Sequence, residues 1–324
     1  MQGKASNLSK TGFSVRHYLA RYVNGKLKRP ESIKQRLDKH IKPLLGAMRI
    51  EDVKPASIDG VLAGIVDKGN NRTANDILHW LKRLFDYAIT RHYIEHNPAR
   101  AFKAADAGGE LKSRNRALSL DEIAILLNTM KGNRGFSETN GYAVRLVLLL
   151  GVRKMELLAA PWAELDLDAG LWKMPAERAK NGQDITIPLP PIALEWLKEL
   201  KWFACGSAYV FPSKGRIKAK NQHMSAAALN VAFDRLEHGL EPFVIHDFRR
   251  TTRSQLAALR IPPHICERCL NHKIQGVEGV YDRYDYLEER REALNAWANV
   301  LNDLENGRKV IPIGKPIASI EGRA

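Results

Sequence analysis

One stretch near the C-terminus gathers the residue types that phosphoryl transfer requires. Residues 246–291 hold histidines, tyrosines and many arginines within a short length of chain. A base, a nucleophile and phosphate-binding cations could therefore come from this segment alone. His246 and Arg249 are three residues apart, Arg249 and His272 are 23 apart, and His272 and Tyr281 are nine apart. Such an arrangement needs no metal ion, so we expect neither a metal nor a cofactor.

Each of these residue types suits one part of the reaction. Breaking a phosphodiester places extra negative charge on its non-bridging oxygens, which guanidinium groups match in shape and sign. Arg153 and Arg249 are the candidate clamp. A phenol with an ordinary pKa of about 10 is a poor nucleophile at neutral pH, so Tyr281 needs nearby cations and a proton acceptor. We expect His246 to be the base and His272 to donate a hydrogen bond to the phosphate.

Two further candidates lie upstream. Residues 171–175 and 184–188 hold alternating or β-branched residues around a polar segment, which predicts a β-hairpin with Asn181-Gly182 in its turn. Lys180 would then lie at the hairpin tip. Glu156 follows Arg153 by three residues on a short predicted helix, where its carboxylate could orient an arginine.

The elements that must position these residues indicate two domains. Residues 1–102 predict an all-α domain with helices at 14–24, from 30 to before Pro43, from 57 to 69 and around 77–89. Residues 103–116 lack apolar periodicity and predict a linker. Residues 117–305 predict a mainly α domain with a small antiparallel sheet, and residues 306–324 predict a mobile tail. A capping box at Ser119 to Glu122 begins the second domain.

Composition indicates a polyanionic partner. The 324 residues carry a net charge of +15, and residues 1–113 hold 21 basic against 11 acidic side chains. Such an excess favours nucleic acid first and an anionic membrane surface second, and a basic surface can also serve solubility alone. No run of 18 apolar residues and no signal-peptide core occurs, so we expect a cytoplasmic protein. Three cysteines are too few and too unevenly spaced for a disulfide framework.

The second predicted helix offers a basic face. Ile33, Leu37 and Ile41 mark its apolar side. The candidate DNA-binding residues are the four cations assigned to its other side, Lys34, Arg36, Lys39 and Lys42.

Five motifs in order resemble the tyrosine recombinases, which include the integrases of phages and genomic islands. They are GVRKMELL around Arg153, ERAKNGQDITIPL with Lys180, HDFR at 246–249, LNH ending at His272 and VYDR with Tyr281. Asn271 stands where glycine is commonest before the histidine. Residues 13–100 resemble the family's core-binding domain, and nothing before Phe13 resembles the arm-binding domain that many relatives carry.

The resemblance implies site-specific cleavage and rejoining of double-stranded DNA through a 3′-phosphotyrosine intermediate, with integration or excision of a mobile element. It also implies that Lys180 protonates the leaving 5′ oxygen. Two domains would close around the duplex as a C-shaped clamp, and four protomers would act together as a homotetramer on DNA. DNA-bending accessory proteins are further candidate partners, and we expect association with the nucleoid. The apolar stripe of the last predicted helix, from Leu287, is a candidate for docking on a neighbouring protomer.

Other readings of the same residues stay open at this point. Tyr284 and Tyr286 are rival nucleophiles, and Lys173 rivals Lys180, although Lys173 falls within a strand. His264, Cys266, Cys269 and His272 crowd together as zinc ligands would, but zinc sites normally pair two such clusters, and the sequence holds no second one. A catalytically silent DNA-binding regulator and a type IB topoisomerase-like enzyme are the alternative functions.

Overall fold

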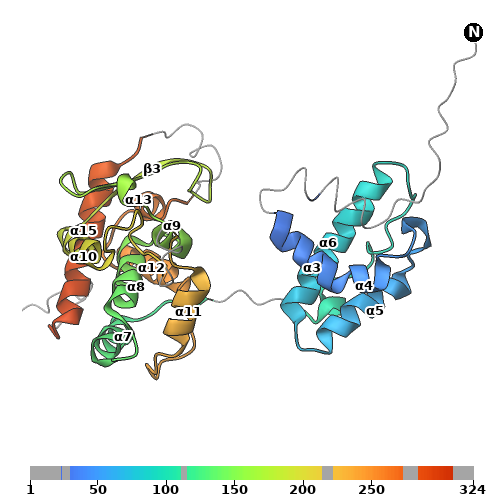
Figure 1. Ribbon diagram of the computed structural model, residues 1–324, viewed down its shortest axis with the longest axis horizontal. Coiled ribbons are helices and arrows are strands. Elements are labelled where there is room, and N and C mark those ends of the chain that lie inside the picture. Colours follow the sequence, from blue (N-terminus) through green and yellow to red (C-terminus); the bar gives the residue numbers. More distant parts are fainter. Residues whose placement is uncertain (1–22, 24–29, 111–114, 214–221, 273–283, 309–324) are drawn as a thin grey trace, which may run out of the picture. The chain divides into compact units, whose positions relative to one another are not determined.

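The computed structural model describes residues 23, 30–110, 115–213, 222–272 and 284–308. The chain divides into two compact units, Met1–Arg114 and Asn115–Ala324 (Figure 1). The helix predicted at 14–24, apart from Val23, and the tail from 309 onward lie outside the described residues. Within the described part, every helix is too short or too polar to cross a membrane.

The first unit is helical, as predicted. Its elements are α3 (Pro30–His40), α4 (Lys42–Leu45), η2 (Ile50–Asp52), α5 (Pro55–Val66), α6 (Asn71–Ile89) and η3 (Ala104–Ala107). The α6 residues at helical spacing, from Ile77 to Ala88, form the centre of its core. Burial of this stripe against α5 stabilises two helices that would be marginal alone.

The segment after residue 102 differs from the predicted linker at its start. Residues 104–107 form η3, which packs against α5 and α6. Two amides of α6 hold it there: Asn71 Nδ2 lies 2.7 Å from the carbonyl oxygen of Gly108, and Asn75 Nδ2 lies 2.9 Å from that of Ala107. These partners are distant in sequence, so the polar composition of the segment did not reveal its docking.

The four candidate DNA-binding cations do not share one helical face. Lys34 and Arg36 are two residues apart on α3 and therefore point to different sides. The helix ends at His40, and Lys42 begins α4 with Pro43 in its first turn. Arg36 also forms a 2.8 Å ion pair with Asp76 of α6. The prediction of a single basic face was wrong because Lys34 and Arg36 point to different sides of α3 and Lys42 belongs to another helix.

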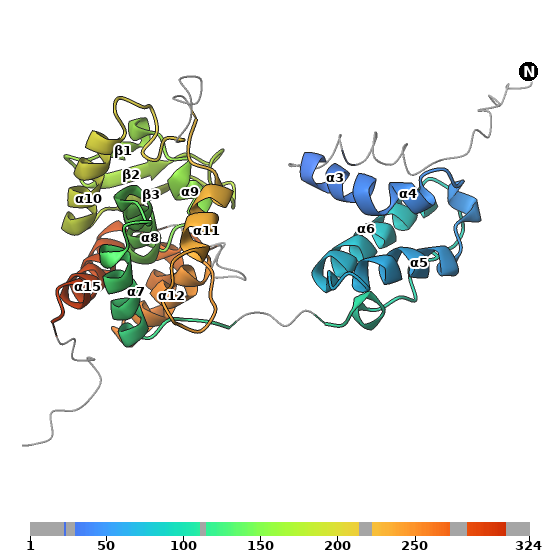
Figure 2. The same cartoon turned by 60° about the horizontal axis from the view of Figure 1, so that its bottom comes forward.

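The second unit places most of its helices around α8. Its elements are α7 (Leu120–Gly132), α8 (Glu138–Leu150), α9 (Lys154–Leu158), η4 (Trp162–Glu164), β1 (Leu165–Asp166), β2 (Leu171–Met174), β3 (Ile185–Pro188), α10 (Pro191–Phe203), α11 (Ala226–Asp234), α12 (Asp247–Ala258), α13 (Pro263–Cys269) and α15 (Leu287–Glu305). Nearly all of α8 is buried, and α10, α12 and α15 pack on it (Figure 2). The predicted capping box begins α7: Ser119 and Glu122 each accept the other's backbone N–H.

The predicted hairpin is confirmed. Strands β2 and β3 pair antiparallel with Trp172 opposite Ile187, and the β2–β3 connection contains Asn181-Gly182. A third strand, β1, pairs with β2 and completes the small sheet. With two residues it is too short for a period-two pattern to predict. The mainly α fold with a small antiparallel sheet agrees with the sequence analysis.

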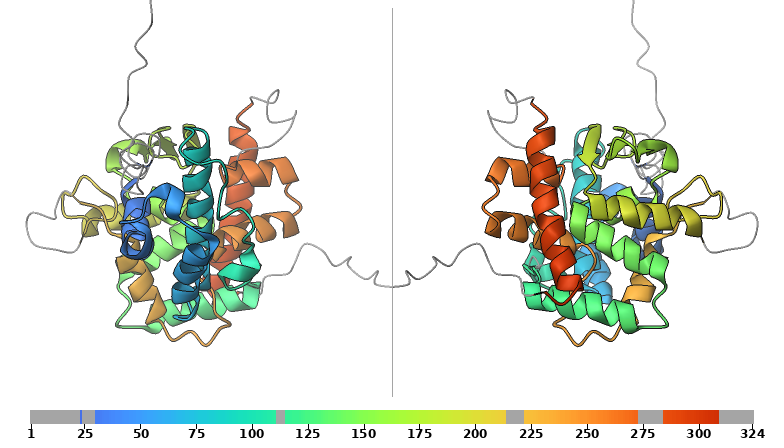
Figure 3. Two further views of the ribbon diagram at one scale, coloured as in Figure 1. Left: turned by 90° about the vertical axis from the view of Figure 1, so that its right-hand side faces the viewer. Right: turned by 90° about the vertical axis from the view of Figure 1, so that its left-hand side faces the viewer.

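The apolar stripe of α15 is buried within its own unit. Ala293, Leu294, Trp297 and Leu301 belong to the large core, where α15 packs along α7, α8 and α13 (Figure 3). The indole of Trp297 donates to the carbonyl oxygen of Leu148 at 3.0 Å. The predicted docking of this stripe on a neighbouring protomer was wrong because these side chains already have partners inside the chain.

Candidate active site

The candidate site begins where α8 ends. Gly151 adopts a left-handed conformation with φ of 60° and ends the helix. A Cβ atom here would lie 3.2 Å from a methyl carbon of Thr252, so only glycine fits without displacement. The carbonyl oxygen of Leu148, in the last turn of α8, accepts hydrogen bonds from the Thr252 hydroxyl at 2.7 Å and from Trp297. Helices α12 and α15 thereby stabilise the end of the helix that leads to Arg153.

Arg153 is the N-cap of α9, and Glu156 holds it. One Glu156 oxygen accepts from the Arg153 backbone N–H, and the other lies 3.0 Å from Nη1 of its guanidinium. Glu156 is buried, with a 4% exposed surface. The prediction that this carboxylate orients an arginine is confirmed.

The same carboxylate reaches the β2–β3 connection. Its Oε1 accepts from the backbone N–H of Lys180 at 3.1 Å. Arg178 donates to the carbonyl oxygens of Glu156 and Ala159 and forms an ion pair with Glu164 at 2.5 Å. The guanidinium of Arg153 and the backbone N–H of Lys180 therefore share one acceptor, Oε1 of Glu156. Lys180 itself is an exposed residue.

Arg249 is a buried cation that faces carbonyl groups. It lies in the first turn of α12, only 4% exposed, and donates to the carbonyl oxygens of Gly151 and, at 2.7 Å, of Leu270. Among the residues that the structure describes, no carboxylate forms an ion pair with it. Burial, together with the positive charge of Arg153, lowers the pKa of Arg249 to about 10, against the opposing effect of Glu156 and Glu267. Two guanidinium groups that repel each other in a partly buried place are suited to an anion.

His272 contacts Arg249 directly. Its Nε2 lies 2.9 Å from Nη2 of Arg249, and its Nδ1 lies 2.5 Å from Oε2 of Glu267. An arginine nitrogen only donates, so Nε2 must accept and the proton must be on Nδ1. From the sequence, we expected His272 to donate a hydrogen bond to phosphate. In the arrangement described, its donor points to Glu267 instead.

His246 precedes α12 and is exposed. Partial burial of its imidazole lowers its pKa, and the charges of Arg249, Lys180 and Arg153 act in the same direction, against the opposing effect of Asp247. Its ring is thus favoured as the neutral form, which can accept a proton. Three other candidate residues, Arg153, Lys180 and Arg249, therefore lie within electrostatic reach of His246.

Tyr281 lies outside the described residues. Of its rivals, Tyr284 is 62% exposed and stacks edge-on against Tyr286, whose ring also packs against His264. Arg268 lies 5.0 Å from the centre of the Tyr286 ring. Lys173 is on β2, paired with Thr186, at a fixed position on the sheet.

The suspected zinc ligands are arranged differently from a metal site. Cys266 and Cys269 are buried, and burial raises the pKa of Cys269 to about 12, so its thiol keeps its proton. The Cys266 sulfur lies 3.4 Å from the carbonyl oxygen of Ile261. Across the described ranges, no three His, Cys, Asp or Glu side chains gather as metal ligands would.

Three contributors to this site were missed by sequence reasoning. Glu267 accepts from both His272 and Arg253, and its pKa is lowered because these two hydrogen bonds outweigh the opposing effect of burial. Arg178 fastens the β2–β3 connection, and Asn181 reaches Asn271. An acidic residue five positions before a candidate histidine was the one available sign of Glu267.

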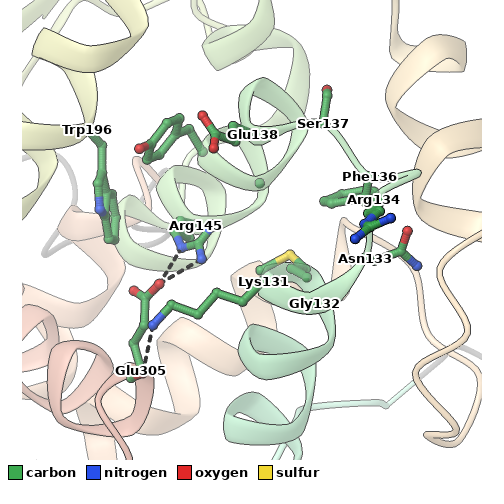
Figure 4. Close-up of a pocket in the computed structure, with 13 residues that line it drawn as sticks. Lys131, Gly132, Asn133, Arg134, Phe136, Ser137, Glu138, Arg145, Trp196 and Glu305 are labelled. Atoms are coloured by element: carbon green, nitrogen blue, oxygen red, sulfur yellow. Dashed lines mark hydrogen bonds and ion pairs between the residues drawn. The ribbon is translucent and has the colours of Figure 1, made fainter.

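A pocket of about 530 Å³ lies elsewhere in this unit (Figure 4). Ser137 and Glu138, at the start of α8, line it together with Lys131, so it is at the opposite end of α8 from Gly151. Arg145 and Glu305 form an ion pair of 2.7 Å at its wall. The candidate active site is therefore separate from this pocket.

Comparisons with known proteins identify the family of this chain. The family model described as "Phage integrase family" matches residues 116–287, and "Phage integrase central domain" matches residues 16–105. The protein is a DNA strand-exchange enzyme of the tyrosine recombinase class. It belongs to the phage integrase family.

Curated relatives span most of the chain. Prophage integrase IntA of Escherichia coli K12 is 28% identical over 286 residues, which are 87% of this chain and 67% of that relative. The integrase of Enterobacteria phage P4 is 27% identical and covers 82% of this chain, with 63% of its own length matched.

Solved structures show the same fold. A lambda integrase tetramer bound to a Holliday junction matches 86% of this chain and 79% of its own, with a TM-score of 0.64 and 22% identity. The Tn1549 transposon integrase in complex with a circular intermediate DNA matches 81% of this chain and 92% of its own, with a TM-score of 0.64 and 16% identity.

Proposed function

We propose that this recombinase cleaves each DNA strand by attack of the Tyr281 hydroxyl on phosphorus. The phenol oxygen forms the new bond to phosphorus, and the bond to the 5′ oxygen breaks. His246 takes the phenol proton, and Lys180 gives a proton to the leaving oxygen. The 5′ hydroxyl of a second strand then attacks the 3′-phosphotyrosine and releases the tyrosine, so the bond energy is kept.

The buried guanidinium of Arg249 is the observation that carries this proposal. No carboxylate in the described part of the chain forms an ion pair with it, and it lies within electrostatic reach of Arg153. A phosphodiester brings the missing negative charge, which increases on the non-bridging oxygens as the tyrosine attacks. The two cations would therefore bind the transition state more strongly than the substrate.

His272 has a different task in this proposal from the one expected first. Because its Nε2 accepts from Arg249, it holds the guanidinium in position, and Glu267 fixes the tautomer that allows this. Donation by His272 to phosphate would require the Arg249 contact to break.

DNA binding and assembly are parts of the same proposal. The first unit would contact the DNA backbone through Lys34, Arg36, Lys39 and Lys42 from two helices. The tetrameric state is suggested by the lambda integrase tetramer on a Holliday junction. DNA-bending accessory proteins would help to shape the sites, and the protein would reside with the nucleoid, integrating or excising a mobile element.

A nicked DNA substrate that loses its short 5′ fragment on cleavage tests the proposal. Wild-type protein should accumulate a covalent adduct, and Tyr281→Phe should form none. Tyr284→Phe and Tyr286→Phe are matched controls that should keep the adduct. An adduct with Tyr281→Phe would place the nucleophile elsewhere, and no adduct with any variant would favour a DNA-binding regulator. Relaxation of supercoiled plasmids without site preference would favour a topoisomerase.

A further inference from the structure

Two asparagines join the segments that carry Lys180 and His272. Nδ2 of Asn181 lies 2.7 Å from Oδ1 of Asn271, although the two residues are 90 positions apart. Asn181 directly follows Lys180, and Asn271 directly precedes His272. Both asparagines are half-buried, where a hydrogen bond is less exposed to competition from water.

The Asn181 side chain is fixed by its own turn. Its Oδ1 accepts from the backbone N–H of Gln183 at 3.2 Å, and the N–H of Gly182 donates to the carbonyl oxygen of Ala179 at 3.0 Å. Because the Oδ1 atom of Asn181 accepts within its own turn, its Nδ2 group faces away from the turn, toward Asn271. Asn271 must therefore offer Oδ1 to Asn181, so the direction of the hydrogen bond is determined.

Asn271 is held equally firmly at the end of α13. It has a left-handed φ of 51°, and its backbone N–H donates to the carbonyl oxygen of Arg268, while the backbone N–H of His272 donates to the carbonyl oxygen of Glu267. This is the Schellman pattern of helix termination, in which glycine is the commonest residue. Glycine would adopt this φ with less strain, but it has no side chain to meet Asn181.

Lys180 thus lies between two anchors. On one side its backbone N–H donates to Glu156, and Arg178 holds the same connection to the backbone of α9. On the other side Asn181 binds Asn271. The exposed Lys180 side chain already has many rotamers. A backbone that also moved would spread the positions of the ammonium group further, so a firmly held backbone is needed to keep this group near its target.

We infer that Asn181 and Asn271 are a pair of positioning residues that set the reach of Lys180 toward the leaving 5′ oxygen. The inference rests on the proposed function, since it assumes that Lys180 donates the proton. The pair acts through the backbone of the β2–β3 connection.

Two matched DNA substrates test this inference with the full-length protein. One contains an ordinary phosphodiester at the cleavage site, and the other a bridging 5′ sulfur, whose thiolate leaves without a proton. Asn271→Gly preserves the left-handed turn and removes the side-chain acceptor at 2.7 Å, leaving Asn181 only the longer 3.4 Å contact to the carbonyl oxygen of residue 271. Asn181→Ala removes the donor. Each should slow cleavage of the phosphodiester about tenfold or more, since misplacement of a proton donor forfeits part of its contribution. Both should cleave the sulfur substrate within about twofold of wild type.

The double variant should be no slower than the slower single variant, because both changes remove one interaction. Asn306→Ala, which removes a side-chain hydrogen bond at the end of α15, is the matched control and should leave both rates unchanged. Equal slowing on both substrates would overturn the inference, as would unchanged rates on both. Failure of the proposed function would look different: Lys180→Ala would then be equally slow on the two substrates.

Discussion

Nη2 of Arg249 and Nε2 of His272 lie 2.9 Å apart, and this contact determines which nitrogen of the imidazole carries the proton. Since arginine only donates, the proton is on Nδ1, where Glu267 accepts it. The histidine therefore links a carboxylate to the buried cation of the candidate site, and Arg253 fixes the other side of that carboxylate at 2.6 Å.

Glu267→Gln should lower stability in a pH-dependent way. The pKa of Glu267 is lowered below its ordinary 4.5, so its contribution is fully present above that value and is lost as the pH falls through the folded-state pKa. The gap in unfolding free energy between wild type and variant should therefore be larger at pH 7 than near pH 3. Urea unfolding at both pH values measures it. Glu195→Gln, at an exposed position on α10, should show a small gap that hardly changes, and an equally constant gap for Glu267→Gln would contradict the prediction.

Phosphate should stabilise this protein through Arg249. An anion held by the buried guanidinium binds the folded state alone, and a concentration tenfold above its dissociation constant adds about 1.4 kcal/mol. For a unit of this size that corresponds to a rise in melting temperature of roughly 3–6 °C. Thermal unfolding in phosphate and in chloride at equal ionic strength measures the rise. Arg249→Met should show no greater rise in melting temperature in phosphate than in chloride. An equal phosphate-specific rise in the wild type and the variant would refute the role of Arg249. The variant should also cleave DNA about 10²–10³-fold more slowly.

The fall of the cleavage rate at low pH should follow the protonation of His246. Protonation removes its ability to accept the tyrosine proton, and its pKa is lowered from the ordinary 6.5 by partial burial and by the surrounding cations. Activity should therefore persist below pH 6.5 and fall only as the pH passes through the lowered value. Single-turnover cleavage between pH 5 and 8 follows this fall, and His246→Gln should be slow and lack it. A midpoint clearly above 6.5 in the wild type would exclude this assignment.

Gly151→Ala should damage both stability and activity. Its φ of 60° costs an alanine about 1–2 kcal/mol, and the new Cβ would crowd Thr252 at 3.2 Å. The shift would move the carbonyl oxygen that accepts from Arg249. Gly170→Ala is a matched control, because its φ is 64° but the nearest atom lies at 3.6 Å. Thermal unfolding should show lower stability for both variants, because both place an alanine at a positive φ. The cleavage assay should show loss of activity only for Gly151→Ala.

An exposed cation of α3 should contribute more to DNA affinity when no carboxylate within the protein forms an ion pair with it. Lys39→Ala removes an exposed charge and should reduce the slope of log affinity against log salt by about 0.9. Arg36→Ala should change the slope less, because Asp76 already neutralises Arg36. Binding titrations over a range of salt concentrations measure both slopes. An equal effect of the two changes would mean that the Arg36 ion pair opens on DNA.

Local periodicity predicted the elements of this fold well. The stripe of α6, the hairpin around Asn181-Gly182 and the capping box at Ser119 all depend on residues close in sequence. Motif spacing likewise indicated Arg153, Lys180, His246, Arg249 and His272, which the structure places on connected elements; their chemical roles stay predictions.

Contacts between distant segments were beyond the same reasoning. The docking of η3 depends on amides of α6, and the burial of the α15 stripe depends on α7, α8 and α13. An apolar stripe shows that a helix face needs a partner but not which one. The tautomer of His272 depends on Arg249 and on Glu267, and one of these lies 23 residues away.

The end of α8 has a consequence for protein synthesis. Its Leu148 carbonyl oxygen is capped by Thr252 and Trp297, which the ribosome adds 104 and 149 residues later. A nascent chain that still lacks these residues leaves the Leu148 carbonyl oxygen without the two donors that cap it in the folded unit. The helix end that leads to Arg153 therefore acquires its full set of hydrogen bonds only after the ribosome has added residue 297.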